Sequence, residues 1–414
     1  MSSNANFYPK RCGWILSIQK PKLSLLIYMM LEKYQLLDEI LQRRLEQKRF
    51  RQLYPFLSNS PSEPTLNFAH QDLFYLLKHD FIKEHSINAI AKWGSGYHHS
   101  REISTHLDEH FRLEELISSI IQKDHIFLFN TSQNIHEWIL SKLSNPKSYL
   151  FIEKELEKQF RLSSFNIKGP VYTFNGNNLE SLDEALQEVS RKENVVKIIA
   201  IETLSSQTGG FWDEKALSEI VKKHNTVLYV DDSSAFGIYG QRGLGLAKNH
   251  KEIDITLYHF QNSLSLPVSA IGVCPFFHNF LHHYLEPSLN LFPLYPSLLG
   301  AFQGMLKLLP DMEAERDHIL SMSKWLRNEL IKKGWNIGSS NSHIIPLYLP
   351  NEQALLSLSK FLAENNVIAL YPQINKNKSE SPSIRFTLHS KHSFSAVKKL
   401  AELLTTWKKS IFDI

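Results

Sequence analysis

The sequence is poor in cysteine and lacks both a long apolar run and a long run of like charges. Cys12 and Cys274 are the only cysteines among 414 residues, too few and too far apart to indicate a disulfide framework or a zinc site, so a reducing cytoplasm fits best. The 46 basic and 42 acidic residues are spread along the chain and leave a net charge of +4. We therefore expect no basic face for nucleic acid.

The most apolar run near the start is too short to cross a bilayer. It comprises the eight residues Leu23 to Met30, against roughly 20 for a membrane-spanning helix. Lys22 and Glu32 flank it and no small-residue cleavage site follows, so a signal peptide is not favoured either. The run is interpreted as a docking helix, as sequence ahead of a start codon at Met29 or Met30, or as an amphipathic anchor giving weak contact with a membrane surface.

The length and composition indicate one large domain and a smaller one. A chain of 414 residues that is 43% hydrophobic and 21% charged can bury a full core. Leucines at helical spacing over 31–54, with charges on the other face, predict an N-terminal arm helix, and the linker Ser58 to Pro64 breaks the pattern. We therefore divide the chain into an N-terminal extension and helical arm (1–60), a large domain (61–300) and a small α+β domain (301–414).

The stretch from Thr226 to Gly272 is expected to form the core of the site. Val227 to Val230 is an apolar run ending in two carboxylates, which predicts a parallel strand buried on both faces with chemistry at its carboxyl end. Glycines then recur within nine positions and allow sharp turns and a close backbone approach; they are Gly237, Gly240, Gly243 and Gly245. Ile253 to Phe260 is the next expected strand.

Strand and helix patterns alternate through the rest of the chain. In the large domain we expect strands at 126–129, 149–152 and 195–202 and helices at 113–121, 135–143 and 217–223. A helix at 298–309 is expected to link the domains. In the small domain we expect strands at 343–349, 367–370 and 383–388 and helices at 352–364 and 395–407. This alternation is typical of an open α/β sheet.

Several of these segments together resemble the α-oxoamine synthase family. The segments are DDSSAFG from Asp231, GIYGQRGLG from Gly237, GSG from Gly94 and HFRLE from His110. The family comprises fold-type I pyridoxal-phosphate enzymes such as 8-amino-7-oxononanoate synthase, glycine C-acetyltransferase and serine palmitoyltransferase. The resemblance implies an α/β fold of the fold-type I PLP-dependent transferase type: a large, mostly parallel sheet with helices on both faces, a smaller C-terminal α+β domain and an N-terminal helical arm.

The resemblance also implies a cofactor site that is partly altered. Asp231 falls on the carboxylate that contacts the ring nitrogen, and Ser206 on the serine that contacts the ring hydroxyl. Thr131 and Ser132 lie in the turn that receives the phosphate in the family, where they still offer hydroxyls for an anion or simply cap a helix.

Other family positions have changed. Ser234 stands where the family has a ring-edge histidine, and His259 where it has a phosphate-binding threonine. Leu156 replaces the stacking histidine. Asn262 occupies the position of the Schiff-base lysine, and its amide can neither hold the aldehyde nor move a proton.

Two arginines are candidates for binding a substrate carboxylate. Arg51, near the end of the arm helix, and Arg385, in the segment SIRFTLHS, fall near the positions that hold this carboxylate in the family. For Arg51 a solvated basic face is the other interpretation. Arg385 is interpreted as this anchor or as a rim residue.

These expectations favour a catalytically silent family member over an enzyme. Pyridoxal phosphate is implied by the family but is not covalently held, or is absent. By analogy with the non-catalytic subunit of eukaryotic serine palmitoyltransferase, the chain is expected to form a homodimer, or a heterodimer with an active paralogue. One alternative is an active acyl-CoA:amino acid transferase that works without an internal aldimine. Another is an anion-binding or small-molecule-binding protein that uses His259, Thr131 and Ser132.

Overall fold

The computed structural model describes most of the chain from residue 66 onward. The described residues are 37, 39–40, 42–43, 66–96, 108–130, 135–157, 167–176, 178–248, 250–284, 293–370 and 381–412. Residues Met1–Pro61 and Ser62–Ile414 form two separate units. In the first unit the described positions are helical, in agreement with the expected arm helix; they are Leu37, Glu39, Ile40, Gln42 and Arg43. Arg51, Thr131 and Ser132 lie outside the described residues.

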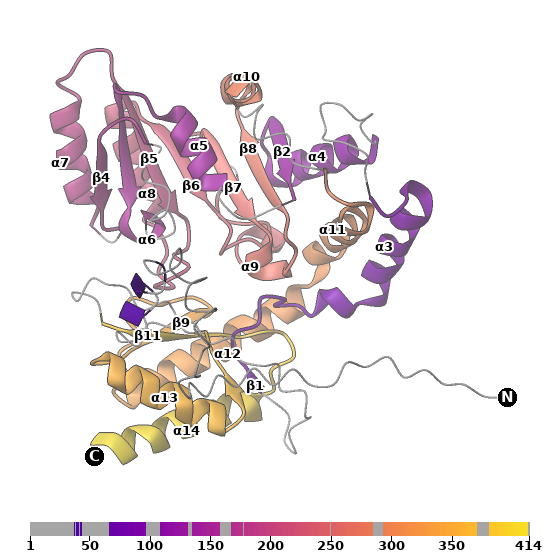
Figure 1. Cartoon of the computed structure of the whole chain (residues 1–414), viewed down its shortest axis with the longest axis vertical. Coiled ribbons are helices and arrows are strands. Elements are labelled where there is room, and N and C mark those ends of the chain that lie inside the picture. The colour runs from indigo at the N-terminus through magenta and orange to yellow at the C-terminus, as the bar shows by residue number, and fades with distance from the viewer. Residues whose placement is uncertain are drawn as a thin grey trace, which may run out of the picture. The chain divides into compact units, whose positions relative to one another are not determined.

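The second unit is built on a seven-stranded sheet (Figure 1). Across the sheet the strands are β2 (His125–Phe129), β8 (Ser269–Val273), β7 (Ile255–His259), β6 (Val227–Asp231), β5 (Val196–Glu202), β3 (Ser148–Glu153) and β4 (Val171–Phe174). From β7 to β4 all neighbours are parallel, and only β8 runs antiparallel to both of its neighbours. The predicted mostly parallel sheet is confirmed.

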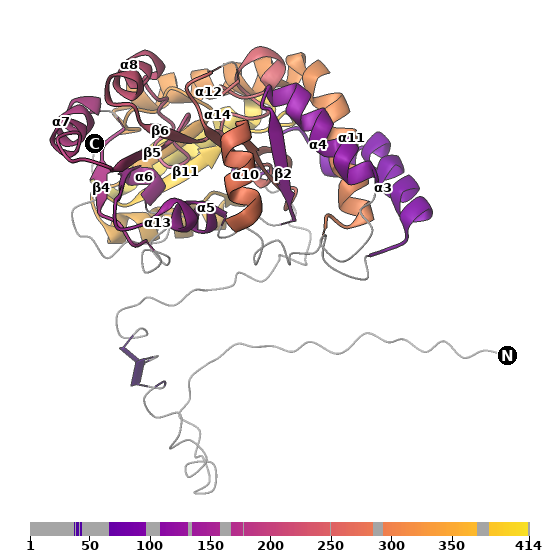
Figure 2. The same ribbon diagram turned by 90° about the horizontal axis from the view of Figure 1, so that it is seen from above.

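Both faces of the sheet are covered by helices (Figure 2). Ile198 and Ala200 of β5 pack with α5 (Ile135–Leu143) and α10 (Pro275–Tyr284) in one apolar cluster. The alternate residues, Ile199 and Ile201, pack with α7 (Leu179–Val189) and α8 (Glu214–His224) in another. Successive side chains of a strand point to opposite faces, so a strand buried on both sides is apolar at every position. This is why the central strands could be predicted as continuous apolar runs.

Further helices complete the packing at the β2 edge. Apolar side chains of α4 (Asp108–Ile121) share a core with Ile126 and Leu128 of β2. α3 (Asp80–Trp93) packs along α11 (Pro296–Leu308), and Gly300 of α11 lies so close to α3 that an added Cβ would stand 2.3 Å from the His85 carbonyl oxygen. α6 (Lys154–Glu157) directly follows β3.

The C-terminal part has the predicted α+β alternation. It contains α12 (Glu313–Lys332), β9 (Ile344–Tyr348), α13 (Glu352–Glu364), β10 (Val367–Ile368), β11 (Ser383–Thr387) and α14 (Phe394–Phe412). β9 and β11 pair antiparallel, while β10 pairs with β1 (Leu66–Asn67) from the start of the unit.

Two strands of the main sheet were not predicted. β4 is an edge strand of four residues, of which only Phe174 is buried, so it carries little apolar signal. β8 is fully buried but contains small residues and a glycine, Gly272. Its place is determined by pairing with β7 and β2, which is a tertiary effect that local pattern does not reveal.

The parallel strands place four titratable side chains along one edge of the sheet. Strands β3, β5, β6 and β7 are neighbours, and they end at Glu153, Glu202, Asp231 and His259. The carboxyl ends of parallel strands meet at a single edge, where ligands of open α/β sheets bind. No helix among the described residues is long and apolar enough to cross a membrane.

The glycine-rich loop after β6 folds back on Asp232. One oxygen of its carboxylate accepts the backbone N–H of Leu246, and the other accepts that of Ala247, each at 3.1 Å. The Thr203 hydroxyl donates to the same side chain at 2.5 Å. Gly240 has a φ of +79°, and a Cβ added there would stand 1.8 Å from the carbonyl oxygen of Gly245. The loop therefore needs glycine for both its backbone angle and its close packing.

We predict that Gly240→Ala destabilises the protein far more than Gly94→Ala. Both glycines have positive φ, but nothing lies within 4 Å of a Cβ added at Gly94. Both backbones lie in a region that is essentially restricted to glycine, so Gly94→Ala should cost about 1–3 kcal/mol, whereas the backbone clash at Gly240 should add several more. Urea unfolding of the two variants measures the difference. Equal losses would show that the loop does not have the described packing.

Candidate functional site

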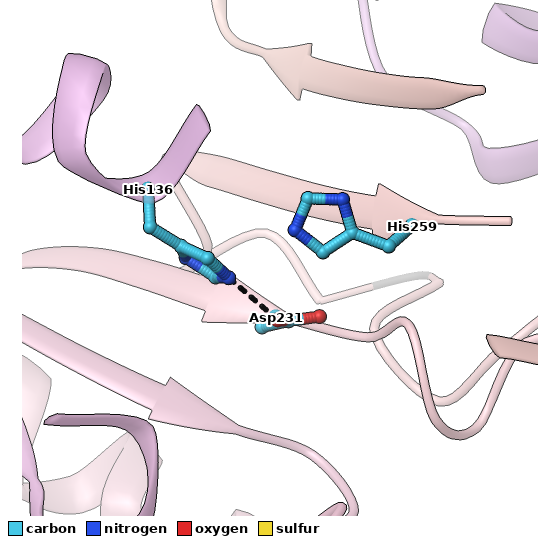
Figure 3. Close-up of side chains that lie close together, drawn as sticks. All are labelled: His136, Asp231 and His259. Atoms are coloured by element: carbon cyan, nitrogen blue, oxygen red, sulfur yellow. Dashed lines mark ion pairs between the residues drawn. The ribbon is translucent and has the colours of Figure 1, made fainter. Parts of the chain in front are cut away.

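Two histidines and an aspartate meet at the carboxyl edge of the sheet (Figure 3). His136 comes from α5, Asp231 from the end of β6 and His259 from the end of β7. One donor atom from each side chain lies within 4.8 Å of the other two. His136 Nε2 is 3.0 Å from Asp231 Oδ2. The three residues are buried, with exposed fractions of 6%, 3% and 7%, so solvent screens their interactions little.

Local structure explains how the three side chains meet. Ile135 and Ile139 of α5 pack into the apolar cluster shared with the strands. His136, on a different side of the helix, points toward the strand ends. Asp231 is the last residue of β6, and β7 lies beside it in parallel register, with Asp231 opposite Leu257. His259, two residues further along β7, therefore reaches the same edge.

Each histidine is oriented by a hydroxyl group. His136 Nδ1 is 2.7 Å from the Tyr229 hydroxyl, and His259 Nδ1 is 2.7 Å from the Ser269 hydroxyl. Burial and Asp231 raise the pKa of Tyr229 well above its usual value, so its hydroxyl stays protonated. Figure 3 shows the other ring nitrogen of His259 turned toward His136 and Asp231. In both residues, Nδ1 is thus engaged with a hydroxyl and Nε2 faces the cluster.

The Asp231 carboxylate is held on both oxygens. Oδ1 accepts the backbone N–H of Ser233 at 2.8 Å and also the Ser233 hydroxyl, while Oδ2 faces His136. Burial alone would raise the pKa of Asp231, but the hydrogen bond and charge of His136, the charge of His259 and the Ser233 hydroxyl outweigh it and lower the pKa to about 2. Burial, aided by His136 and opposed by Asp231, lowers the pKa of His259 to about 4.

The neighbouring strand ends carry two carboxyl groups. Burial, with Asp231 and Glu153 nearby, raises the pKa of Glu202 well above its usual value. Burial also raises the pKa of Glu153 to about 7, although the Glu202 backbone N–H donates to its carboxylate at 3.0 Å and opposes the shift. The edge of the sheet therefore tends to keep these two carboxyl groups neutral beside an ionised Asp231.

Arg385 of β11 reaches this edge from the C-terminal part. Its guanidinium donates to the backbone carbonyl of Ser206, and the Ser206 N–H in turn lies 3.3 Å from a Glu202 carboxylate oxygen. Burial lowers the pKa of Arg385 to about 10, and the nearby Glu202 opposes this shift. Ser206 and Arg385, for which separate roles were predicted, are thus linked by a direct hydrogen bond.

The other predicted site residues lie close by. Ser234 is buried and follows Ser233 in the turn after β6. Asn262 lies in α9 (Gln261–Leu264), the helical turn just after β7, and is half-buried. Sequence reasoning missed His136, since its segment was read as an ordinary helix. The available signal was a histidine at the start of the helix that follows the expected phosphate turn.

The fold is that of the fold-type I PLP-dependent transferase class. Residues 154–404 match the aminotransferase class I and II family, and the chain belongs to that family. The matched range begins at α6 and includes strands β4 to β8 and most of the C-terminal part.

Relatives and solved structures agree with the predicted resemblance to α-oxoamine synthases. The chain is 24% identical over 385 residues to a putative 8-amino-7-oxononanoate synthase of Desulfosudis oleivorans, covering 92% of this chain and 100% of that protein. It is 23% identical to a serine palmitoyltransferase of Bacteriovorax stolpii, covering 82% and 81%.

Solved structures support the fold. A serine palmitoyltransferase from S. paucimobilis superposes with a TM-score of 0.81 at 16% identity, covering 93% of this chain and all of the other. An 8-amino-7-oxononanoate synthase from Francisella tularensis superposes with a TM-score of 0.69 at 19% identity, covering 84% and 98%. The expected fold class is confirmed.

Two features of the site count against a covalently held pyridoxal phosphate. A pyridine nitrogen needs a carboxylate partner, but Asp231 Oδ2 already faces His136 and Oδ1 is bonded to Ser233. The position that the resemblance assigns to the lysine holds Asn262, whose amide cannot form an imine. A ring nitrogen placed on Asp231 would have to share or take over the Oδ2 atom that His136 contacts.

The raised pKa of Glu153 predicts a stability loss on raising the pH. The folded protein favours the protonated carboxyl, so this stabilisation is full below about pH 4.5 and is lost as the pH rises to about 7, by up to about 3 kcal/mol. Glu153→Gln should remove this component, and the exposed Glu193→Gln should not. Urea unfolding at several pH values measures it. A stability difference between the wild type and the Glu153→Gln variant that stays constant from about pH 4 to about pH 8 would contradict the burial argument.

Proposed function

We propose that this chain is a catalytically silent α-oxoamine synthase homologue that acts as a dimer or as the partner subunit of an active paralogue. The observation that carries this proposal is the pairing of Asp231 with His136, at 3.0 Å between Nε2 and Oδ2. A family enzyme needs this carboxylate to hold a pyridinium, which is the electron sink of the reaction. Here the chain's own imidazole contacts the same carboxylate and competes for it.

Two further positions support the same proposal. Asn262 offers no amine where a covalent cofactor link would form. Arg385, the candidate substrate anchor, donates to the Ser206 carbonyl and stands beside Glu202. A guanidinium already matched by protein groups gains less from a substrate carboxylate, since those contacts must be given up on binding.

An active PLP-dependent acyltransferase without an internal aldimine is the second candidate. Asp231 stays ionised, with a pKa of about 2, so it retains the charge that a pyridinium requires. The S. paucimobilis serine palmitoyltransferase structure is of a lysine-to-alanine variant with a bound PLP–myriocin aldimine. Pyridoxal phosphate offered together with an amino acid is therefore the stringent test of silence.

We predict no cofactor capture by the wild-type chain. After mixing with pyridoxal phosphate and serine and removal of the free cofactor, the chain should show no visible absorption, and borohydride should fix no stoichiometric adduct on peptides of the site. Turnover of an acyl-CoA with glycine, serine or alanine, lost in Asp231→Ala, would instead establish the second candidate. Added to a lysine-containing paralogue, the silent chain should raise the activity or stability of that paralogue.

We predict further that restoring the lysine alone is insufficient. Asn262→Lys should give little covalent adduct, because His136 still holds Asp231. The double variant Asn262→Lys/His136→Asn should give much more, measured as borohydride-fixed adduct by mass spectrometry. Asn262→Lys with the exposed His283→Asn is the matched control. Full capture by Asn262→Lys alone would show that the pairing does not block the ring.

A further inference from the structure

We propose that His136, Asp231 and His259 form a binding site for a divalent transition metal, with zinc the best-fitting ion, in the place where the fold's relatives hold an organic ring. This inference does not depend on the proposed silence or on a partner subunit. It rests on the geometry of three buried donors, on their chemistry and on the groups that orient them.

The geometry is close to that of a coordination shell. Zinc binds histidine nitrogen and carboxylate oxygen at about 2.0–2.2 Å, which places tetrahedral ligand atoms about 3.3 Å apart. His136 Nε2 and Asp231 Oδ2 are already 3.0 Å apart. The His259 donor atom lies within 4.8 Å of both, so it has to move closer to the other two for all three to bind one ion.

The donor types select the class of metal. Two imidazole nitrogens and one carboxylate oxygen suit zinc, cobalt, nickel or ferrous iron, whereas magnesium and calcium prefer oxygen ligands alone. Binding requires neutral imidazole and ionised carboxylate.

The surrounding hydroxyl groups act as a supporting shell. A metal-binding histidine usually donates its second N–H to a fixed acceptor, which sets the tautomer and the ring orientation. Tyr229 offers its oxygen to His136 Nδ1, and Ser269 offers its oxygen to His259 Nδ1, each at 2.7 Å. Ser233 holds the far oxygen of Asp231. All three ligands are thus oriented by partners outside the cluster.

Three protein donors leave at least one coordination position for water or a small ligand. This distinguishes the proposed site from a closed structural zinc site, which uses four protein ligands. The other explanation of the cluster is a buried ion pair between His136 and Asp231 with His259 as a neighbour, and the experiment separates the two.

The test uses the purified full chain, stripped with a chelator and then loaded with zinc or cobalt. We expect one metal ion per chain by mass spectrometry, an intense visible cobalt spectrum typical of low coordination number, and a higher melting temperature with zinc but not with magnesium. Asp231→Asn and His259→Gln should each weaken zinc binding by at least about 100-fold, and Tyr229→Phe by about 10-fold.

The matched control is the surface pair His278→Asn/His282→Asn on α10, where two histidines at helical spacing could bind zinc adventitiously. This control should keep the zinc. The proposal is overturned if the wild-type chain binds less than one zinc ion, if the cobalt spectrum is weak as for a fully hydrated ion, or if only the surface variant loses metal. If Asp231→Asn or His259→Gln fails to fold, the zinc affinity of Tyr229→Phe and the cobalt spectrum of the wild-type chain still test the metal site.

Pyridoxal phosphate capture is measured separately, so the two proposals fail independently. A chain that takes up the cofactor but no zinc refutes both, and a chain that takes up neither refutes only the metal site.

Discussion

The pairing of His136 with Asp231 determines what the rest of the site can do. Both side chains are buried, and removing one partner of such a pair typically costs about 3–5 kcal/mol because a charge is left uncompensated. A ligand that uses Asp231 must therefore either share the carboxylate with the imidazole or replace the imidazole with an equally favourable partner. A metal ion does so by binding both groups at once, whereas a pyridinium binds only the carboxylate. The contact between His136 and Asp231 thus argues against pyridoxal phosphate and for a metal ion.

The sheet explains why so many titratable groups share one edge. Parallel strands begin and end together, and the apolar residues needed for burial on both faces push polar residues to the strand ends. Glu153 and Glu202 sit there with raised pKa values, whereas Asp231 stays ionised because His136, His259 and Ser233 stabilise its charge. Burial is common to all three carboxyl groups. The partners of each one decide its protonation state.

Much of the fold could be predicted from the sequence because its signals are local. The helices α5 and α13 and the strand β6 follow directly from apolar spacing, and the family motifs placed them in order. The edge strand β4 and the antiparallel strand β8 could not be predicted, since pairing rather than composition defines them. The site divides in the same way. Asp231 was predicted from its strand end, but the approach of His136, from a helix far away in the sequence, and the link between Arg385 and Ser206 arise only in the folded chain.

The most direct test is a crystal structure of the full chain soaked with pyridoxal phosphate. We expect His136 Nε2 to remain within hydrogen-bond distance of Asp231, with no pyridine ring between Asp231 and Asn262. A ring whose nitrogen lies on Asp231, with His136 rotated away, would contradict the account.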